Sequence, residues 1–251
     1  MEISLAAEPL FKIGSFSVTN SLMMSWIVLA LLAAIGIKIK RGLSVIPKGL
    51  QNVMEYVFEM LLGMIEGVTG DREQAKKFFP VIVTIFLFVI LCNWIGLLPG
   101  MGTVGIHEEL HGKEVLVPFI RAGSADLNFT LAIAVISVFC TQFFGIAAIG
   151  FFKYAGKFLV SPFKKPFFIG TFVGFLELVS EITKLISFSF RLFGNIFAGE
   201  ILLMVMLSLV PWLVPLPFLL LEIFVGFVQA LVFSMLTLVF MKMATVAHGE
   251  H

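Results

Sequence analysis

The sequence predicts an all-α polytopic membrane protein with about five membrane-crossing helices and one interfacial amphipathic helix. Of its 251 residues, 59% are apolar and 13% are charged, and the mean hydropathy is +1.07. Soluble domains are about 45–50% apolar and about 25% charged, so this composition excludes a soluble globular protein, a disordered chain and a nucleic-acid-binding protein. The apolar runs are also continuous, whereas the strands of an outer-membrane barrel alternate in polarity over ~10 residues.

A single membrane domain is expected over residues 1–251, beginning with an outer N-terminal segment, 1–17, and a first span, 18–37. The segment contains acidic residues and has no basic start before an apolar core, so no cleavable signal peptide is evident. The first span ends where three basic residues follow, Lys38, Lys40 and Arg41.

Residues 46–67 have the pattern of an amphipathic helix. Polar side chains recur every three to four residues, and apolar side chains fill the opposite face. Such a helix is expected to lie on the membrane surface, with its apolar side in the lipid.

Four further apolar runs predict the other crossings. A short charged linker, 71–77, is expected before the second span, which is expected at 79–98, and the third span is expected at 127–152. The run 167–210 would form a helix about 66 Å long at ~1.5 Å per residue, against ~30 Å of hydrocarbon. This run and the last one, 218–246, are therefore expected to be strongly tilted and to form a hairpin.

The Lys and Arg residues of the loops predict the orientation. Twelve lie on the side of segments 38–78 and 151–166 and of the C-terminal tail, and three lie on the opposite side. Because basic loops stay in the cytoplasm, the N-terminus is expected outside and the C-terminus inside.

Ionisable side chains inside the last two runs are the candidates for function. A charge at the centre of the bilayer costs ~2.5–3.5 kcal/mol even on the mildest scale, so such residues pair with one another or line a water path. Glu181 and Lys184 are spaced to pair within one helix, whereas Arg191 has no acid three or four residues away. The six residues are Glu177, Glu181, Lys184, Arg191, Glu200 and Glu222.

The antiparallel hairpin sorts these residues into two clusters. A register that places Gln229 level with Arg191 also places Glu200 level with Glu222, and it brings Lys242 near the inner acids. The proline turn favours a register shifted by a few residues, so neighbouring registers stay open. The outer cluster is then Glu200 and Glu222, and the inner cluster is Glu177, Ser180, Glu181, Lys184 and, in this register, Lys242.

Carboxylates can take up and release protons, whereas arginine does not lose its proton in proteins. Two proton-accepting clusters separated by a permanent cation predict two half-channels with Arg191 as the barrier between them. A proton then needs a carrier to pass Arg191, which predicts a partner with a buried carboxylate.

The segment from Arg191 to Glu200, RLFGNIFAGE, resembles the signature of subunit a of F-type ATP synthases of the bacterial type. Gln229 in the last helix agrees with this resemblance, and so do three further segments, PKGLQN at 47–52, NWIGLLP at 93–99 and SADLNFT at 124–130.

The resemblance implies a proton-conducting stator that is not an enzyme on its own and has neither cofactor nor metal. Arg191 would be the essential cation facing the subunit c ring. Subunit c, the subunit b peripheral stalk, other ATP synthase subunits and the lipid bilayer would be its partners, in a bacterial plasma membrane. The outer path would comprise Glu200, Glu222, Asp126, Asn128, Asn93 and Gln229, and the inner path Glu177, Ser180, Glu181, Lys184 and Ser187.

The family commonly has one Glu and one His at the positions of Glu200 and Glu222, whereas this chain has two acids, which can share a proton. The sequence leaves open whether the transported ion is a proton or a sodium ion.

Two other interpretations were weighed. A lone secondary transporter should show broken helices repeated in two halves, and the sequence shows no such symmetry. A zinc protease is suggested by His107-Glu-Glu-Leu-His111, but that motif needs a helix and here lies between two glycines in an expected loop.

Overall fold

The computed structural model describes residues 9–14, 16–98, 105–110, 113–118, 121–158, 169–210 and 214–246. Within these ranges five helices are long and apolar enough to cross a membrane. They are α1 (Asn20–Arg41), α3 (Arg72–Gly96), α4 (Leu127–Ile149), α6 (Ile169–Leu209) and α7 (Pro215–Thr245). The expected all-α polytopic membrane fold is confirmed.

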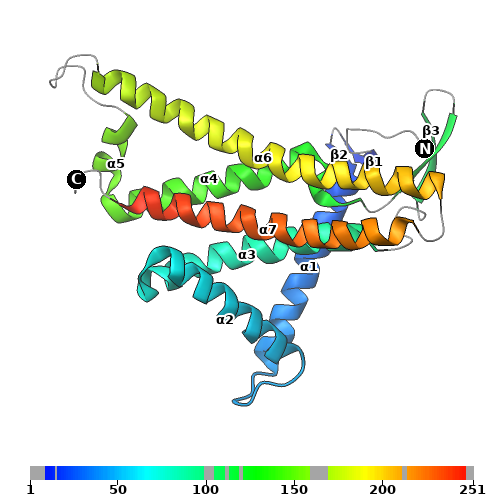
Figure 1. Cartoon of the computed structure of the whole chain (residues 1–251), viewed down its shortest axis with the longest axis horizontal. Coiled ribbons are helices and arrows are strands. Elements are labelled where there is room, and N and C mark those ends of the chain that lie inside the picture. The colour runs from blue at the N-terminus through cyan, green and yellow to red at the C-terminus, as the bar shows by residue number, and fades with distance from the viewer. Residues whose placement is uncertain are drawn as a thin grey trace.

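Helices α3, α4, α6 and α7 run side by side along the long axis of the molecule (Figure 1). Helix α1 leaves this bundle at an angle, and α2 (Leu50–Thr69) returns from its end toward the far end of α3. Helices α6 and α7 lie close together near their connection and separate toward the opposite end. There the short helix α5 (Phe151–Phe158) lies between α4 and α6.

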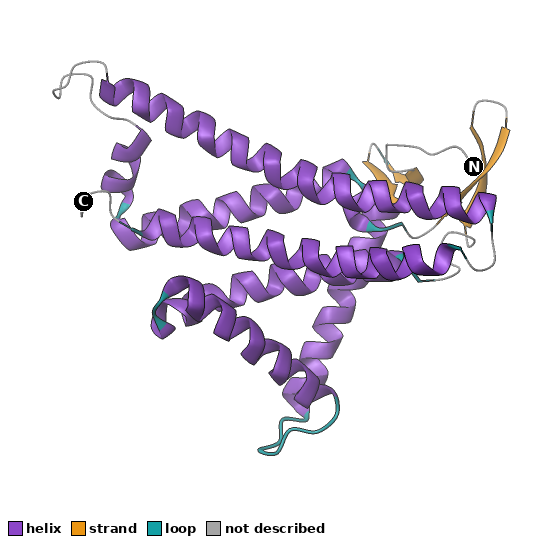
Figure 2. Cartoon of the chain, in the orientation of Figure 1, coloured by secondary structure: helices purple, strands orange, loops and turns teal. Residues whose placement is uncertain are grey.

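Two short antiparallel hairpins lie at the end of the bundle where α1 begins (Figure 2). Strand β1 (Pro9–Ile13) pairs with β2 (Phe16–Thr19), and β3 (Gly105–Leu110) pairs with β4 (Lys113–Pro118). The hairpins were not expected from the apolar runs, because their segments are too short to cross a bilayer.

Several helix ends differ from the expected boundaries for local reasons. The charged segment 71–77, expected as a linker, forms the first turns of α3, because the Asp71 carboxylate accepts hydrogen bonds from the amides of Glu73 and Gln74. Helix α2 starts at Leu50 rather than at 46, after Gly49 with a φ of 57°. Helix α4 ends at Ile149 rather than at 152, because Gly150 with a φ of 88° turns the chain into α5.

The last two helices are longer than the membrane is thick. Helix α6 has 41 residues and α7 has 31, which correspond to about 62 Å and about 47 Å. Both exceed the ~30 Å of hydrocarbon, so both must tilt or extend beyond the lipid tails.

The core joins the four central helices through apolar side chains and a few hydroxyl pairs. Ser137 of α4 bonds Thr237 of α7 at 2.7 Å between hydroxyl oxygens, and Thr130 of α4 bonds Ser189 of α6 at 3.1 Å. Such hydrogen bonds between small residues hold helices together within a bilayer, where the hydrophobic effect does not drive helices to associate. The buried apolar side chains that pack between the helices include Phe86, Val89, Ile133, Leu192, Ile196 and Phe233.

The short 3₁₀ turn η2 (Gly123–Ala125) is held in the bundle by a close approach at the end of α3. A Cβ atom on Gly96 would lie 2.6 Å from the Cα of Ala122, so only glycine allows this contact. All three residues of η2 are buried, and they contact α1, α3, α4 and α6. Gly96 therefore fixes where the chain enters the bundle before α4.

Replacing Gly96 by alanine should lower the free energy of unfolding by about 1–3 kcal/mol, because the added methyl group meets backbone atoms that cannot move aside. Thermal unfolding of the purified protein in detergent measures the effect. Gly36→Ala in α1 is the control, since no heavy atom lies within 4 Å of its Cβ position. Equal unfolding temperatures for the two variants would contradict the packing argument.

Candidate functional site

Arg191 lies on the face of α6 that points away from the bundle. Its neighbours Phe188, Leu192 and Ile196 are buried in the core, which turns the Arg191 side chain to the exposed side. Its Nη2 donates a hydrogen bond to the hydroxyl of Ser187 at 3.2 Å. In the described part of the chain no carboxylate lies within ion-pair distance of the guanidinium. A permanent cation thus stands in the middle of a membrane-spanning helix without an acidic partner.

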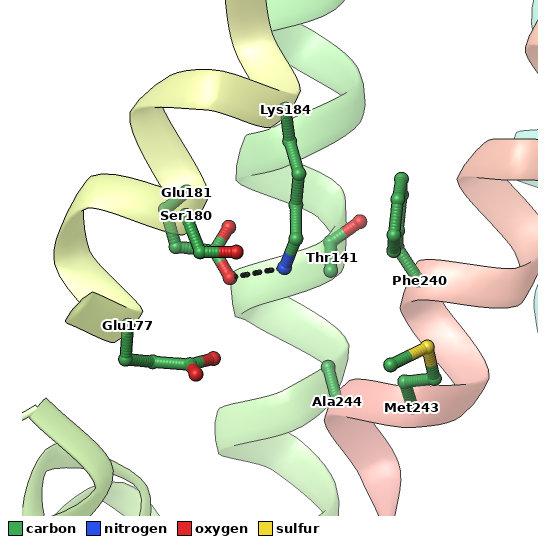
Figure 3. Close-up of a pocket in the computed structure, with 8 residues that line it drawn as sticks. All are labelled: Thr141, Glu177, Ser180, Glu181, Lys184, Phe240, Met243 and Ala244. Atoms are coloured by element: carbon green, nitrogen blue, oxygen red, sulfur yellow. Dashed lines mark hydrogen bonds and ion pairs between the residues drawn. The ribbon is translucent and has the colours of Figure 1, made fainter. Parts of the chain in front are cut away.

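The inner acids line a cavity where α6 and α7 separate (Figure 3). The inner cavity has a volume of about 290 Å³. The Nζ of Lys184 lies 2.7 Å from Oε1 of Glu181, so the expected i, i+3 pair forms. The residues lining the cavity are Glu177, Ser180, Glu181 and Lys184 from α6, Thr141 from α4, and Phe240, Met243 and Ala244 from α7.

A chain of hydrogen bonds ties Glu181 to α4 and α5. Gln142 Nε2 donates to Glu181 Oε2 at 3.0 Å, and the Tyr154 hydroxyl donates to Gln142 Oε1 at 2.5 Å. Burial and the charges of Glu181 and Glu177 raise the pKa of Tyr154 to about 12, so the hydroxyl keeps the proton that it donates. The sequence analysis missed both residues, although a glutamine within the apolar span of α4 was an available signal.

A groove of about 440 Å³ lies next to the inner cavity and reaches Arg191. Ser180, Lys184 and Phe240 line both hollows, and Ser187 and Arg191 line the groove. The predicted inner residues therefore line two adjoining hollows that together extend from Glu177 to Arg191. Lys242, placed near the inner acids by the level register, instead donates to the carbonyl of Val68 at the end of α2.

The two outer glutamates have different surroundings. Glu222 on α7 is buried and faces Gly199 of α6, where a Cβ atom would overlap its carboxylate. Glu200 instead accepts hydrogen bonds from Arg121, with Nε 3.2 Å from each carboxylate oxygen and Nη2 3.1 Å from Oε2. The sequence analysis counted Arg121 only as a loop charge, because nothing local shows that residues 121 and 200 meet.

Two contacts between α6 and α7 indicate slightly different hairpin registers. The Oε1 of Gln229 accepts a hydrogen bond at 2.7 Å from Nδ2 of Asn195, which lies one helical turn beyond Arg191. Glu222 faces Gly199, so the two predicted outer glutamates lie close to level, as in the register that placed Gln229 beside Arg191. Gln229 therefore lies about one turn from Arg191, toward the α6–α7 connection, within the range of registers that stayed open.

The other predicted outer residues lie near η2 but do not share one surface. Asp126 is buried, caps α4 through the amide of Asn128 at 3.0 Å, and accepts a hydrogen bond from the Ser21 hydroxyl of α1. Asn93 Nδ2 donates to the carbonyl of Gly226 at 3.2 Å. The side chain of Asn128 is exposed at the start of α4.

Several buried polar atoms on η2 and on nearby helices have no hydrogen-bond partner among the described residues. A buried unsatisfied polar group costs about 1–3 kcal/mol, so such atoms normally mark a place where water enters. The residues that carry them span η2 and three helices, α1, α3 and α7, and two of them, on α1 and in η2, were not predicted. Within the described ranges these atoms are Asn20 Nδ2, Asn93 Oδ1, Ser124 Oγ, Glu222 Oε1 and Gln229 Nε2.

The structure does not support the zinc-protease interpretation. His107 lies in strand β3, whereas the protease motif requires two histidines on one face of a helix. His111 lies outside the described residues. Across the described ranges, no three His, Cys, Asp or Glu residues are grouped as metal ligands.

Comparison with known proteins agrees with the resemblance seen in the sequence. A sequence model of the family described as "ATP synthase A chain" matches residues 22–242. ATP synthase subunit a of Helicobacter pylori (strain P12) is 35% identical over 96% of this chain and 92% of its own length. Subunit a of Campylobacter jejuni subsp. doylei is 35% identical over 84% and 83%, and that of Helicobacter pylori (strain Shi470) is 36% identical over 88% and 87%. The chain therefore belongs to the ATP synthase A chain family, as a multi-pass membrane component of the ATP synthase complex.

Proposed function

We propose that this subunit is the proton-conducting stator of a rotary ATP synthase, with two offset half-channels that meet the subunit c ring on either side of Arg191. Other ATP synthase subunits are its partners by family membership. The c ring would pack against the exposed face of α6, and the subunit b stalk and the lipid would contact other surfaces. The subunit would conduct protons without catalysing ATP formation itself.

The observation that carries this proposal is the exposed, acid-free position of Arg191 at the end of the groove. A charge in the hydrocarbon layer is costly without a partner, so a neighbouring subunit must supply an acidic group at this level. A carboxylate on a moving ring meets that need. When it approaches the guanidinium it loses its proton, because a nearby cation favours the charged form of an acid.

The inner half-channel would run from Glu177 through the inner cavity and the groove to Arg191. Its polar groups come from one face of α6, and the separation of α6 and α7 leaves the space between them. The Glu181–Lys184 pair places one negative and one positive charge on this wall, and the pair itself adds no net charge. A water-filled path lined by these polar groups can pass protons to and from the cytoplasm.

The outer half-channel would follow the unpartnered polar atoms from η2 to α7. Asn20 and Ser124 lie at its entrance, and Asn93 and Glu222 lie further in. Gln229, bonded to Asn195, is its innermost member and lies about one turn from Arg191. Waters that satisfy these buried atoms would connect the outer surface with Glu222.

Arg191 separates the two routes because a guanidinium does not release its proton. A proton arriving at Glu222 can therefore cross only on a ring carboxylate. The same arrangement fits an N-terminus on the outer side and a cytoplasmic C-terminus in a bacterial plasma membrane, as the loop charges predict.

Arg191→Ala should abolish ATP-driven proton pumping in inverted membrane vesicles while the complex still assembles. The reason is that the ring carboxylates would no longer lose their protons at this level, and no fixed cation would separate the two half-channels. Arg72→Ala is the matched control, because Arg72 pairs with Glu66 at the exposed start of α3. Pumping at the normal rate in Arg191→Ala would overturn the stator proposal and favour a transporter acting alone.

Gly199→Ala should strongly reduce pumping, because its methyl group would displace the Glu222 carboxylate. Gly36→Ala, also within a membrane-crossing helix but with open space around it, should leave pumping unchanged. Quenching of a pH-sensitive dye in inverted vesicles measures both variants. Normal pumping by Gly199→Ala would show that the position of Glu222 does not matter to the outer path.

A further inference from the structure

Arg121 binds Glu200 more extensively than a surface ion pair would. The side chain of Arg121 is only 9% exposed, and that of Glu200 is 28% exposed. Two nitrogens of the guanidinium contact both carboxylate oxygens, at 3.1–3.2 Å. The cation also lies 5.9 Å from the centre of the Phe197 ring, one turn before Glu200. Shared charge-assisted bonds of this kind are among the strongest in proteins, and they need the carboxylate in its ionised form.

Glu222 has a contrasting environment a short distance away. It is 5% exposed and one of its oxygens has no hydrogen-bond partner. Throughout the described ranges, no cation lies within ion-pair distance of it. The two outer acids therefore differ in a property that governs proton exchange: Glu200 is paired with a permanent cation, and Glu222 is not.

We propose that Arg121 is a positioning residue that keeps Glu200 ionised, so that Glu222 is the only member of the pair that carries protons through the outer path. The inference rests on the proposed proton-conducting function and specifies how its outer half-channel works. Arg121 does not touch the transported proton and acts only through Glu200.

The physical reason is that two neighbouring acids without a cation share one proton. Each would then hold the proton part of the time, and Glu200 could retain a proton that Glu222 should pass on. The guanidinium of Arg121 cannot deprotonate, so its charge stays beside Glu200 and favours the ionised form of that carboxylate.

The fold holds Arg121 in place from a loop rather than from a helix. The next residue, Ala122, packs against Gly96 of α3, and η2 follows at once. From this anchored position the Arg121 side chain reaches Glu200 of α6. The site thus requires α3, η2 and α6 together, which explains its absence from any local sequence pattern.

Carbodiimide labelling of the whole complex in membranes tests the protonation state, because carbodiimides react with protonated carboxyl groups. Mass spectrometry of peptides from this subunit reports each glutamate separately. In the unmodified protein we expect label on Glu222 and not on Glu200. In Arg121→Gln we expect label on both, whereas in the control Arg72→Gln, which alters a surface pair, the unmodified pattern should persist.

Proton pumping in the same vesicles provides the second measurement. Arg121→Gln should pump about twofold more slowly, as expected when Glu200 holds a shared proton about half of the time. Arg121→Gln/Glu200→Gln should pump faster than Arg121→Gln, because the competing acid is gone. Glu222→Gln should not pump, since it removes the carrier.

The outcomes separate this inference from the function on which it rests. If Glu222→Gln pumps normally, the proposed outer half-channel is wrong. If Glu222→Gln is inactive but Glu200 is labelled in the unmodified protein, or stays unlabelled in Arg121→Gln, only the role of Arg121 is wrong. Should Arg121→Gln fail to assemble, Arg121→Met replaces it. A methionine removes the cation while keeping a long side chain, so Glu200 labelling should rise above the unmodified level, and no rise would overturn the inference.

Discussion

The cost of a permanent charge in the hydrocarbon layer governs the arrangement of this subunit. Arg191 sits on a helix face that the rest of the described chain leaves uncovered, with a serine hydroxyl as its polar contact. On a soluble protein, water would hydrate such a cation, whereas the hydrocarbon tails of a bilayer cannot. The inner groove reaches one side of Arg191. In the proposed function a partner would supply the remaining polar contact, and two helices as long as α6 and α7 would present an extended face to a subunit c ring.

The outer side is organised by η2, a three-residue turn in a segment without a long helix of its own. Its close packing against Gly96 places Arg121 against Glu200 and leaves Ser124 buried without a partner. Within the described ranges two cations, Arg121 and Lys184, each pair with one acid of a predicted cluster, Glu200 and Glu181 respectively. Each predicted cluster thereby combines an ion pair with further polar groups.

The sequence analysis was accurate where the signal is local and weak where it depends on distant contacts. The Glu181–Lys184 pair was anticipated because residues three apart on a helix always lie near each other. The hairpin register stayed open by a few residues, because an antiparallel register depends on side-chain packing along the whole hairpin, and Gln229 bonds Asn195, one turn of α6 from Arg191. The charged start of α3 was misread as a linker, although Asp71 is a residue typical of helix caps.

The sequence by itself determined the membrane fold class, the apolar runs that form the spans, and the isolation of Arg191 from any nearby acid on its own helix. These features follow from hydropathy and from a helical period of 3.6 residues, which act over one or two turns. Only the tertiary structure decided that Arg121 binds Glu200, 79 residues away, and that Gln142 and Tyr154 extend the inner network. It also decided which polar atoms are buried without partners. Such pairings depend on how η2 and α5 enter the bundle, and no periodicity in the chain encodes a loop's path between packed helices.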